Sequence, residues 1–324
     1  MSPRARRPTE HEWIGRLVRA LPRAGRGVLL GPGDDAAALR VGGATLLVTT
    51  DALVEGTHFR AGWYAPRALG ARAYGVNASD LAAMGGRPFA AVMALEVPGD
   101  VHTATLDGIV AGFVAAAGAH GATLVGGNLT RGPALAITVT LLGRAGPRLV
   151  TRAGARPGDH VFVTGRVGAM GAAVRERRRG RRAPLPRVPD RIRAGALLAR
   201  VASAMIDVSD GLVQDLGHVA HASRVAIRLE GARIPVAPAC RRRVGDGALA
   251  LALTAGEDYE LACTVPPRRS AALARLAARL GCPLTRIGVV ESGRPSVAVT
   301  GPDGARLRLG RAGFDHLAAP RGRR

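Results

Sequence analysis

The chain has 324 residues and a mass of 33.3 kDa, with 47% hydrophobic and 22% charged residues, which excludes a disordered chain and leaves room for two domains. Its formal charge is +22, but all 46 basic residues are arginine and only 3% of residues are aromatic. We therefore attribute the positive charge to a drift in coding composition and expect no nucleic-acid partner. The missing lysine excludes a Walker P-loop, the strand lysine of protein kinases and Schiff-base chemistry; any ATP must be held by metals, arginines and backbone amides.

The first half of the sequence predicts strands that alternate with helices. A capping box formed by Thr9 and Glu12 opens an amphipathic helix. A glycine-rich turn with Asp34 and Asp35 follows, and then a buried strand over 44–48 that stops in hydroxyls and a carboxylate. Polar groups at the end of an apolar strand suit a site better than a core. The other predicted elements are helices over 66–77, from 81 and over 103–117, and strands over 90–95, 123–125 and 135–142.

Glycine and proline cluster over 144–157, which predicts a boundary between an N-terminal domain, 1–147, and a C-terminal domain, 148–324. The second half repeats the order of apolar strand, acidic turn and helix over 205–222. We interpret the basic run over 177–184 as a solvated loop in preference to a phosphate-binding arm. Because strands and helices alternate, we expect an α/β class with one sheet in each half. The other predicted elements are strands over 160–164, 259–265 and 296–300, and helices over 168–176 and 270–280.

Cysteine usage and hydropathy indicate the compartment. Cys240, Cys263 and Cys282 are odd in number and have no CxxC spacing, so neither a disulfide framework nor a zinc site is indicated. No apolar run approaches the ~20 residues of a membrane helix, and no apolar signal core follows the basic residues 1–7. We therefore expect a cytoplasmic protein with no membrane partner.

Five aspartates stand beside glycine or at the end of a predicted strand, where a short carboxylate can reach an ion: Asp35, Asp51, Asp80, Asp207 and Asp210. Mg²⁺ prefers oxygen ligands and is held by a few carboxylates together with substrate phosphates. Bunched carboxylates repel one another unless a cation neutralises them. Each residue alone is also a common turn residue, and Asp80 and Asp210 could cap the helices that follow them. Spacing alone therefore leaves metal-dependent phosphate chemistry and structural turns open.

Several blocks of the sequence resemble the thiamine-monophosphate kinase family, in the family's order and over nearly the whole chain. They include Gly33-Asp34-Asp35, the stretch 49–59, Asn77-Ala78-Ser79-Asp80, Gly126-Gly127-Asn128, Asp207-Val208-Ser209-Asp210, Gly256-Glu257-Asp258-Tyr259 and the stretch 313–316. The resemblance implies a two-domain fold like that of aminoimidazole ribonucleotide synthetase. It also implies that the N-terminal domain contributes strands to a β-barrel across a homodimer.

The resemblance further implies a reaction, in which ATP phosphorylates thiamine monophosphate to thiamine diphosphate by direct in-line transfer without a phosphoenzyme. The dominant cost is repulsion between two phosphates, which several Mg²⁺ ions offset. No general base is expected, because a phosphate oxygen is already a nucleophile. The partners implied are ATP, thiamine monophosphate and a second copy of the chain.

The roles of individual residues are carried over from the same resemblance. The implied magnesium ligands are Asp35, Thr49, Thr50, Asp51, Asp80, Asn128, Asp207 and Asp210. The implied ATP contacts are Gly127, Asn128, Arg152 and Ser209. The implied substrate contacts are His58, Glu257 and Phe314, the last by stacking on the ring. Without the resemblance, His58 would be a loop histidine, Glu257 the exposed start of a strand and Phe314 a core aromatic.

The chain departs from the family at two places. Asn128 stands where the family usually has an aspartate on magnesium; its amide oxygen can still ligate Mg²⁺, but one negative charge is lost. We therefore expect weaker magnesium affinity and not inactivity. The stretch 175–191 looks shorter than the family's and has an altered arginine–proline pattern, so we expect a different shape of substrate access.

Three alternatives remain open from the sequence. Among relatives of the same fold, selenophosphate synthetase uses an N-terminal cysteine or selenocysteine with a lysine, and the hydrogenase-maturation protein ends in a cysteine tail; neither feature is present in this sequence. A degenerate member that binds nucleotide or thiamine phosphate with weak or no kinase activity would be compatible with Asn128. A basic nucleic-acid binder is the third alternative, and salt-sensitive binding would identify it.

Overall fold

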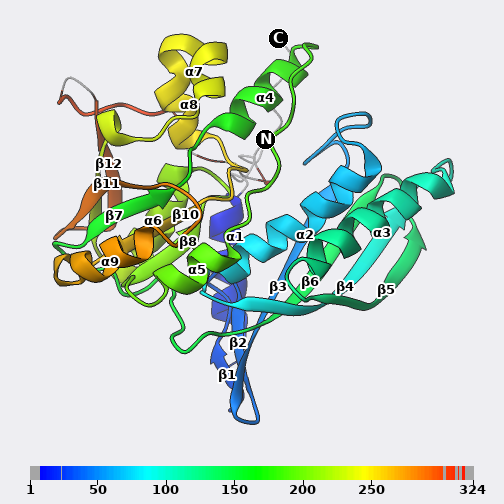
Figure 1. Ribbon diagram of the computed structural model, residues 1–324, viewed down its shortest axis with the longest axis horizontal. Coiled ribbons are helices and arrows are strands. Elements are labelled where there is room, and N and C mark those ends of the chain that lie inside the picture. The colour runs from blue at the N-terminus through cyan, green and yellow to red at the C-terminus, as the bar shows by residue number, and fades with distance from the viewer. Residues whose placement is uncertain (1–7, 23, 302–303, 311–312, 314–315, 318–324) are drawn as a thin grey trace, which may run out of the picture.

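The structure is a computed structural model that describes residues 8–22, 24–301, 304–310, 313 and 316–317. Within this part, the chain is a mixed α/β, two-domain fold with two six-stranded sheets, one built from residues 28–144 and the other from residues 160–300. Helix α2 (Pro66–Ala83) lies between the two sheets (Figure 1). One buried cluster joins Leu81 and Met84 of the first half to Met205 and Leu261 of the second, so the two halves share a core.

The first sheet has the strand order β1-β2-β3-β6-β4-β5, and its pairs are antiparallel except for β4 with β5. In the single chain this sheet is open, with β1 and β5 at its edges, and the described residues form no closed barrel. Its elements, after α1 (Glu10–Ala20), are β1 (Val28–Leu30), β2 (Ala37–Val41), β3 (Ala44–Val54), α2, β4 (Arg87–Val97), α3 (Thr103–Gly118), β5 (Thr123–Arg131) and β6 (Ala136–Arg144).

Helices α2 and α3 pack closely because two glycines lie at their crossing. A Cβ atom at Gly70 would lie 1.8 Å from the carbonyl oxygen of Ile109, and one at Gly112 would lie 1.9 Å from the carbonyl oxygen of Arg67. Any side chain at either position would force the helices apart. The small residues of this alanine-rich sequence thus set a short interhelical distance, which compensates for the scarcity of aromatic side chains.

The second sheet has the strand order β12-β9-β11-β7-β10-β8, with β9 and β12 parallel and the other pairs antiparallel. Its residues make a second buried cluster dominated by alanine, valine and leucine. Its elements are β7 (His160–Thr164), α4 (Ala169–Arg178), α5 (Ile192–Leu198), β8 (Ala204–Asp207), α6 (Leu212–Ser223), β9 (Ala226–Glu230), η1 (Gly231–Arg233), α7 (Pro238–Val244), η2 (Gly245–Gly247), α8 (Ala248–Thr254), β10 (Leu261–Val265), η3 (Pro267–Arg269), α9 (Ser270–Ala277), β11 (Leu284–Glu291) and β12 (Ser296–Thr300).

Three of the expected local structures are wrong. Strand β3 does not stop at residue 48 but continues to Val54, because Thr49 and Thr50 pair with β6 as regular strand residues. The strand expected over 123–125 does not end there, since β5 continues through 126–128 to Arg131. Helix α2 is continuous to Ala83, so Asp80 lies in its last turn and caps no helix.

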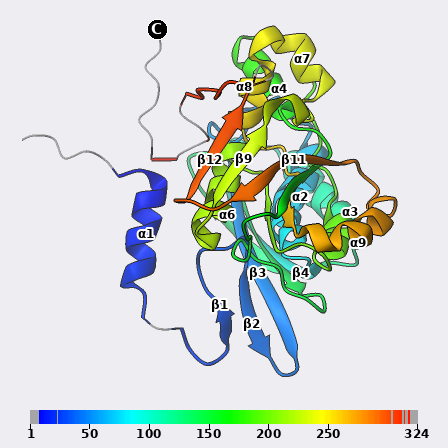
Figure 2. The same cartoon turned by 90° about the vertical axis from the view of Figure 1, so that its left-hand side faces the viewer.

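The N-terminal helix α1 begins with the predicted capping box. The Thr9 hydroxyl oxygen accepts a hydrogen bond from the Glu12 amide at 3.2 Å, and the Glu12 carboxylate accepts one from the Thr9 amide at 2.8 Å. Figure 2 shows α1 standing apart from both sheets, and its apolar side chains Trp13, Ile14 and Leu17 are exposed. In the described part of the chain, no helix has both the length and the apolar run that crossing a membrane would need.

Candidate active site

A cleft of about 840 Å³ opens between the two halves of the chain. Strand β3, helix α2, the turn between β8 and α6, and helix α4 all contribute to its walls. Most of the predicted site residues line it, namely Asp35, Thr49, Thr50, Asp51, His58, Asp80, Arg152, Asp207, Ser209, Asp210 and Glu257.

Three carboxylates meet at the floor of this cleft. Asp35, Asp80 and Asp207 each offer an oxygen, and these oxygens all lie within 4.8 Å of one another. Asp35 and Asp207 are buried, and the Oδ2 atom of Asp35 has no hydrogen-bond partner among the described residues. A buried carboxylate oxygen without a partner is costly. The oxygen-only set and this unpartnered acceptor fit a hard divalent cation.

Neighbouring hydroxyls and one arginine hold the three carboxylates in place. The Thr49 hydroxyl donates to Asp80 at 2.5 Å, and the Ser79 hydroxyl donates to Asp207 at 2.7 Å. Arg152 donates to Asp35 through Nη2 at 2.7 Å. Ser79 had no role in the sequence analysis; its only signal is its place directly before Asp80 on α2.

Asp34 holds the backbone of Arg152 in place. Its two carboxylate oxygens accept from the Arg152 amide at 3.0 and 3.3 Å. Burial, followed by the charge of Asp35, raises the pKa of Asp34 to about 6. Asp34 thus anchors the backbone of Arg152, whose side chain reaches Asp35, and the sequence analysis had treated it only as a turn residue.

The electrostatics of the cluster favour a bound cation. Burial raises the pKa of Asp35 and, together with Asp207, raises the pKa of Asp80 well above its ordinary value. Burial and then Asp35 raise the pKa of Asp207 to about 8, and burial and then Asp210 raise the pKa of Asp51 to about 6. Each shift means that the ionised form is disfavoured without a counter-charge.

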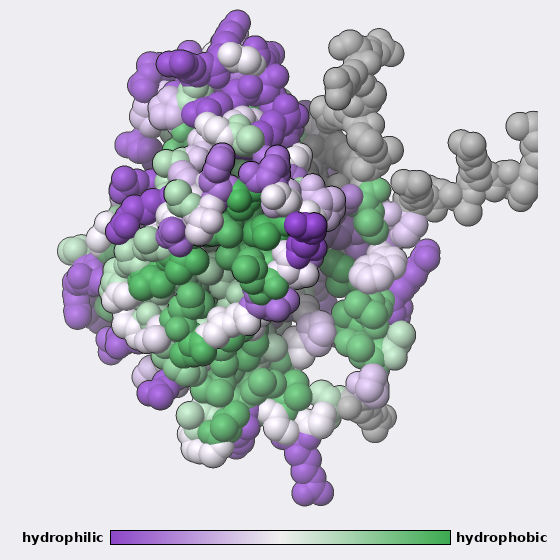
Figure 3. Space-filling model, turned by 90° about the vertical axis from the view of Figure 1, so that its right-hand side faces the viewer, coloured by the Kyte–Doolittle hydropathy of each residue, from purple (hydrophilic) through white to green (hydrophobic). Residues whose placement is uncertain are grey.

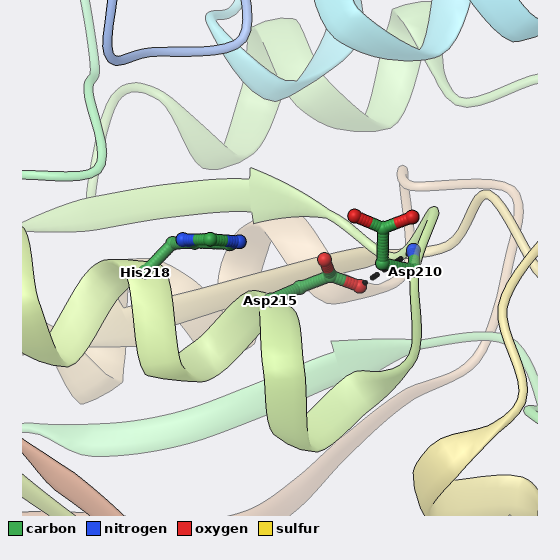
Figure 4. A group of neighbouring side chains, drawn as sticks. All are labelled: Asp210, Asp215 and His218. Carbon is green, nitrogen blue, oxygen red and sulfur yellow. Dashed lines mark hydrogen bonds between the residues drawn. The ribbon is translucent and has the colours of Figure 1, made fainter. Parts of the chain in front are cut away.

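The acidic turn before α6 is held by Asp215 (Figure 4). The Asp215 Oδ2 atom accepts from the amides of Asp210 and Gly211 at 3.2 and 3.0 Å, while the Asp210 carboxylate accepts from the Gln214 side-chain amide of α6 at 3.2 Å. Gly211 is the N-cap of α6 and no side chain caps the helix, so Asp210 is not the cap that the sequence allowed. Asp215 and His218 lie close enough to Asp210 to share an ion, but Asp215 is engaged with the backbone. We therefore assign Asp215 to holding the turn.

His58 and Glu257 also line the cleft, and the Glu257 amide donates to the Ser209 carbonyl of the acidic turn at 2.7 Å. His58 Nδ1 accepts from the Val54 amide at 3.0 Å, so its hydrogen is on Nε2. Burial, followed by His316 and Arg72, lowers the pKa of His58 to about 4, so the ring is a neutral donor at pH 7. Glu257 Oε1 pairs with Arg72 at 2.6 Å. The predicted contact Phe314 lies outside the described residues.

One face of helix α4 forms a wall that the sequence analysis missed. Gly171, Val174, Arg175, Arg178 and Arg179 line the cleft, at a spacing that places them on one side of the helix. The prediction that the basic run begins a solvated loop is therefore wrong at its start, since α4 continues to Arg178. These arginines remain exposed to solvent and give the cleft a cationic wall opposite its carboxylates.

Two predicted residues lie elsewhere. Gly127 and Asn128 are on β5, the exposed edge strand, and β6 and β4 separate β5 from β3. They do not line the cleft of the single chain. Gly127 has a structural reason for being small, because a Cβ atom there would lie 1.9 Å from the carbonyl oxygen of Met93 on the neighbouring strand.

The fold and the cleft define the class of protein. The family model of the AIR synthase related protein, N-terminal domain, matches residues 33–145, and that of the AIR synthase related protein, C-terminal domain, matches residues 156–300. The two matched segments correspond to the two sheets, and the carboxylates at the cleft floor come from both. The chain is thus a two-domain protein of the AIR synthase related class.

Individual relatives narrow this class to one family. The thiamine-monophosphate kinase of Escherichia coli K12 is 38% identical over 311 residues, covering 90% of this chain and 93% of the relative. That of Mycobacterium tuberculosis H37Rv is 37% identical, covering 82% and 84%. A solved structure described as AaThiL complexed with AMPPCP and TMP is 31% identical and superposes with a TM-score of 0.82, covering 95% of this chain and 97% of the other. The chain belongs to the thiamine-monophosphate kinase family.

Proposed function

We infer that the chain uses ATP to phosphorylate thiamine monophosphate, giving thiamine diphosphate and ADP. The observation that carries this inference is that aspartates from separate blocks of the sequence meet in one cleft. The chain that forms this cleft is similar to thiamine-monophosphate kinases over about nine-tenths of its length. The relative bound to AMPPCP and TMP supports a cleft that takes a nucleotide and a thiamine phosphate together.

We propose that Mg²⁺ ions occupy the floor of this cleft. Asp35, Asp80 and Asp207 would hold them, with Asp51 and Asp210 at the flanks and the hydroxyl oxygens of Thr49 and Thr50 beside them. Magnesium bound there would neutralise phosphate charge and bring the two phosphates into reach. The unpartnered Asp35 oxygen and the raised pKa values of the carboxylates support this assignment.

The residues of the chain then bind and orient, and none needs to remove a proton. A phosphate oxygen is already a nucleophile, so positioning and charge stabilisation supply most of the catalysis. Arg152 would balance the charge of Asp35 and reach the nucleotide, with Ser209 beside it. His58 would offer its neutral Nε2 hydrogen, and Glu257 a carboxylate, to the phosphate acceptor.

We also propose a homodimer in which the edge strand β5 meets a second copy of the chain, completing a β-barrel across the interface. Nearly every residue of β5 is exposed, including Val125 at 63% and Leu129 at 62%, and an exposed edge is a template for pairing. Figure 3, which views the molecule from the side where β5 lies, has a broad area of hydrophobic residues on this face. In such a dimer Gly127 and Asn128 would serve a site completed by both copies.

We place the reaction in the cytoplasm. Cys240, Cys263 and Cys282 are all free thiols, and two of them are buried. Disulfides are rare in cytosolic proteins, where thiols are kept reduced. The free thiols therefore support this location.

A product assay tests the proposed reaction. Purified protein is incubated with ATP, Mg²⁺ and thiamine monophosphate, and thiamine diphosphate is separated by chromatography, with Asp80→Asn as the matched variant. We expect product from the wild type and a loss of about a hundredfold or more from the variant, because one carboxylate of the cluster is removed. Binding of both ligands without any product from the wild type would instead support the degenerate alternative.

A further inference from the structure

A buried arginine pairs with Glu257, one of the proposed substrate contacts. Arg72, on helix α2, is 4% exposed, and its guanidinium lies between the rings of Tyr64 and Tyr259, 5.5 and 5.6 Å from their centroids. Its Nη2 atom donates to Glu257 Oε1 at 2.6 Å. The pair joins helix α2 of the first half to the segment before β10 of the second half.

Stability alone does not explain this pair. The Nε and Nη1 atoms of Arg72 are buried and have no hydrogen-bond partner among the described residues. Buried charge pairs are often no more stable than apolar residues of similar volume, and unpartnered donors add a further cost. If packing alone mattered, a methionine at residue 72 would make the fold at least as stable. The charge at this position therefore points to a role in the cleft.

Glu257 is the member of the pair that faces the cleft. Its side chain is 27% exposed against 3% for Arg72, and it lines the cleft. Its backbone is left-handed, with φ of 70°, and its amide donates to the Ser209 carbonyl at 2.7 Å. A non-glycine residue in this conformation is costly and is held by its surroundings. Arg72 takes Oε1 and thereby aims the rest of the carboxylate at the cleft.

Helix α2 connects this pair to the carboxylates at the floor. Arg72 and Asp80 are eight residues apart on one continuous helix, which corresponds to about 12 Å along its axis. Val76, midway between them, also lines the cleft. The helix therefore fixes the spacing between the backbone that carries Arg72, the partner of Glu257, and the backbone that carries Asp80.

We propose that Arg72 is a positioning residue that holds Glu257 to accept an N–H group from the ring end of the phosphate acceptor. The ligand class is a phosphate ester that carries an amino-substituted heteroaromatic ring at the far end from its phosphate, as the aminopyrimidine of a thiamine phosphate does. Arg72 itself does not bind the phosphate, because its remaining N–H groups are buried behind Glu257. This inference rests on the proposed function.

Three single variants test the inference. Arg72→Met removes the charge and keeps an unbranched stem, Arg72→Lys keeps a charge without the planar fork, and Arg67→Met is the control, because Arg67 is exposed on the same helix and does not line the cleft. The readouts are the Kd of thiamine monophosphate by calorimetry without ATP, and separate KM values for both substrates. A lost charge-assisted hydrogen bond corresponds to about a tenfold or greater change in affinity.

We expect Arg72→Met to raise the Kd and KM of thiamine monophosphate at least about tenfold while the KM of ATP changes less than about twofold. Arg72→Lys should recover part of the loss, and Arg67→Met should match the wild type. A variant Glu257→Gln should lose acceptor affinity, and adding Arg72→Met to it should cost little more, because Arg72 acts through Glu257. The double variant has no unpaired buried carboxylate, so it also serves where Arg72→Met alone folds poorly.

Other results would overturn the inference. A wild-type Kd for thiamine monophosphate in Arg72→Met would remove the role of Arg72 and leave the proposed function intact. Equal losses for ATP and thiamine monophosphate would show that Arg72 only stabilises the fold. A wild-type protein that neither binds nor phosphorylates thiamine monophosphate would remove the proposed function, and this inference with it.

Discussion

Replacement of Asp207 by asparagine should make the metal-free protein more stable while removing its activity. The oxygens of Asp35, Asp80 and Asp207 lie within 4.8 Å of one another, and at an effective dielectric constant of about 20 two unit charges at that distance repel by about 3 kcal/mol. The raised pKa gives a similar value: with a pKa of about 8 in the folded protein against 3.8 ordinarily, Asp207 costs about 4 kcal/mol at pH 7.

The sign of this effect follows from proton binding. Between pH 4 and pH 8 the folded state keeps a proton on Asp207 that the unfolded chain releases, so wild-type stability falls as pH rises through this window. Asp207→Asn removes that penalty. Its amide oxygen can still accept from the Ser79 hydroxyl, so little else is lost.

Thermal unfolding in EDTA measures this prediction. We expect Asp207→Asn to be more stable than the wild type by about 2–4 kcal/mol at pH 8, and by much less at pH 4.5. Added Mg²⁺ should then stabilise the wild type more than the variant, because ligand binding stabilises the folded state in proportion to its affinity. A variant that is no more stable than the wild type in EDTA at pH 8 would refute the idea that burial, together with the neighbouring carboxylates, disfavours the ionised form of Asp207 in the metal-free cleft.

Three further predictions follow from the same structure. Asn128→Asp restores a charge and should lower the Mg²⁺ concentration needed for half-maximal activity; an unchanged titration would count against Asn128 as a ligand. The double variant Val125→Glu with Leu129→Glu should be monomeric by light scattering, because it places charges on the proposed β5 interface, and a persisting dimer would place the interface elsewhere. The hydrogen bond to Asp190 raises the pKa of His120, so the stabilisation by this ion pair is complete below pH 6.5 and is lost as pH rises. His120→Asn should therefore lower the free energy of unfolding by under about 1 kcal/mol at pH 6 and by less at pH 9. An equal loss at the two pH values would exclude the ion pair.

The sequence was most informative where a motif is local. The aspartates at 35, 51, 80, 207 and 210 could be predicted to converge because each lies in a recognisable block, and the structure brings them to one cleft. The hydroxyls of Thr49 and Ser79, which hold two of these carboxylates, depend on contacts 31 and 128 residues apart in the chain, so no local pattern shows their partners.

The predicted boundaries of helices and strands were wrong where polar residues that line or support the cleft lie within a helix or a strand. Asn77, Ser79 and Asp80 read as a helix break, yet Asn77 is buried and donates to the Ala73 carbonyl within α2. Thr49 to Asp51 resemble the end of a strand because they are polar, but β3 continues to Val54 while these residues line the cleft. In both places tertiary context overrides the local preference. The role of Arg72 could not be predicted from the sequence either, because its partner Glu257 is 185 residues away in the chain.

The central claim is that carboxylates from both halves of the chain gather divalent cations between two phosphates. The most direct measurement is a crystal of the protein grown with Mn²⁺, a non-hydrolysable ATP analogue and thiamine monophosphate, examined by anomalous scattering. We expect an anomalous peak within ligand distance of Asp35, Asp80 and Asp207, with phosphate oxygens completing its coordination. Both phosphates bound in the cleft, with no peak at these carboxylates, would contradict the account.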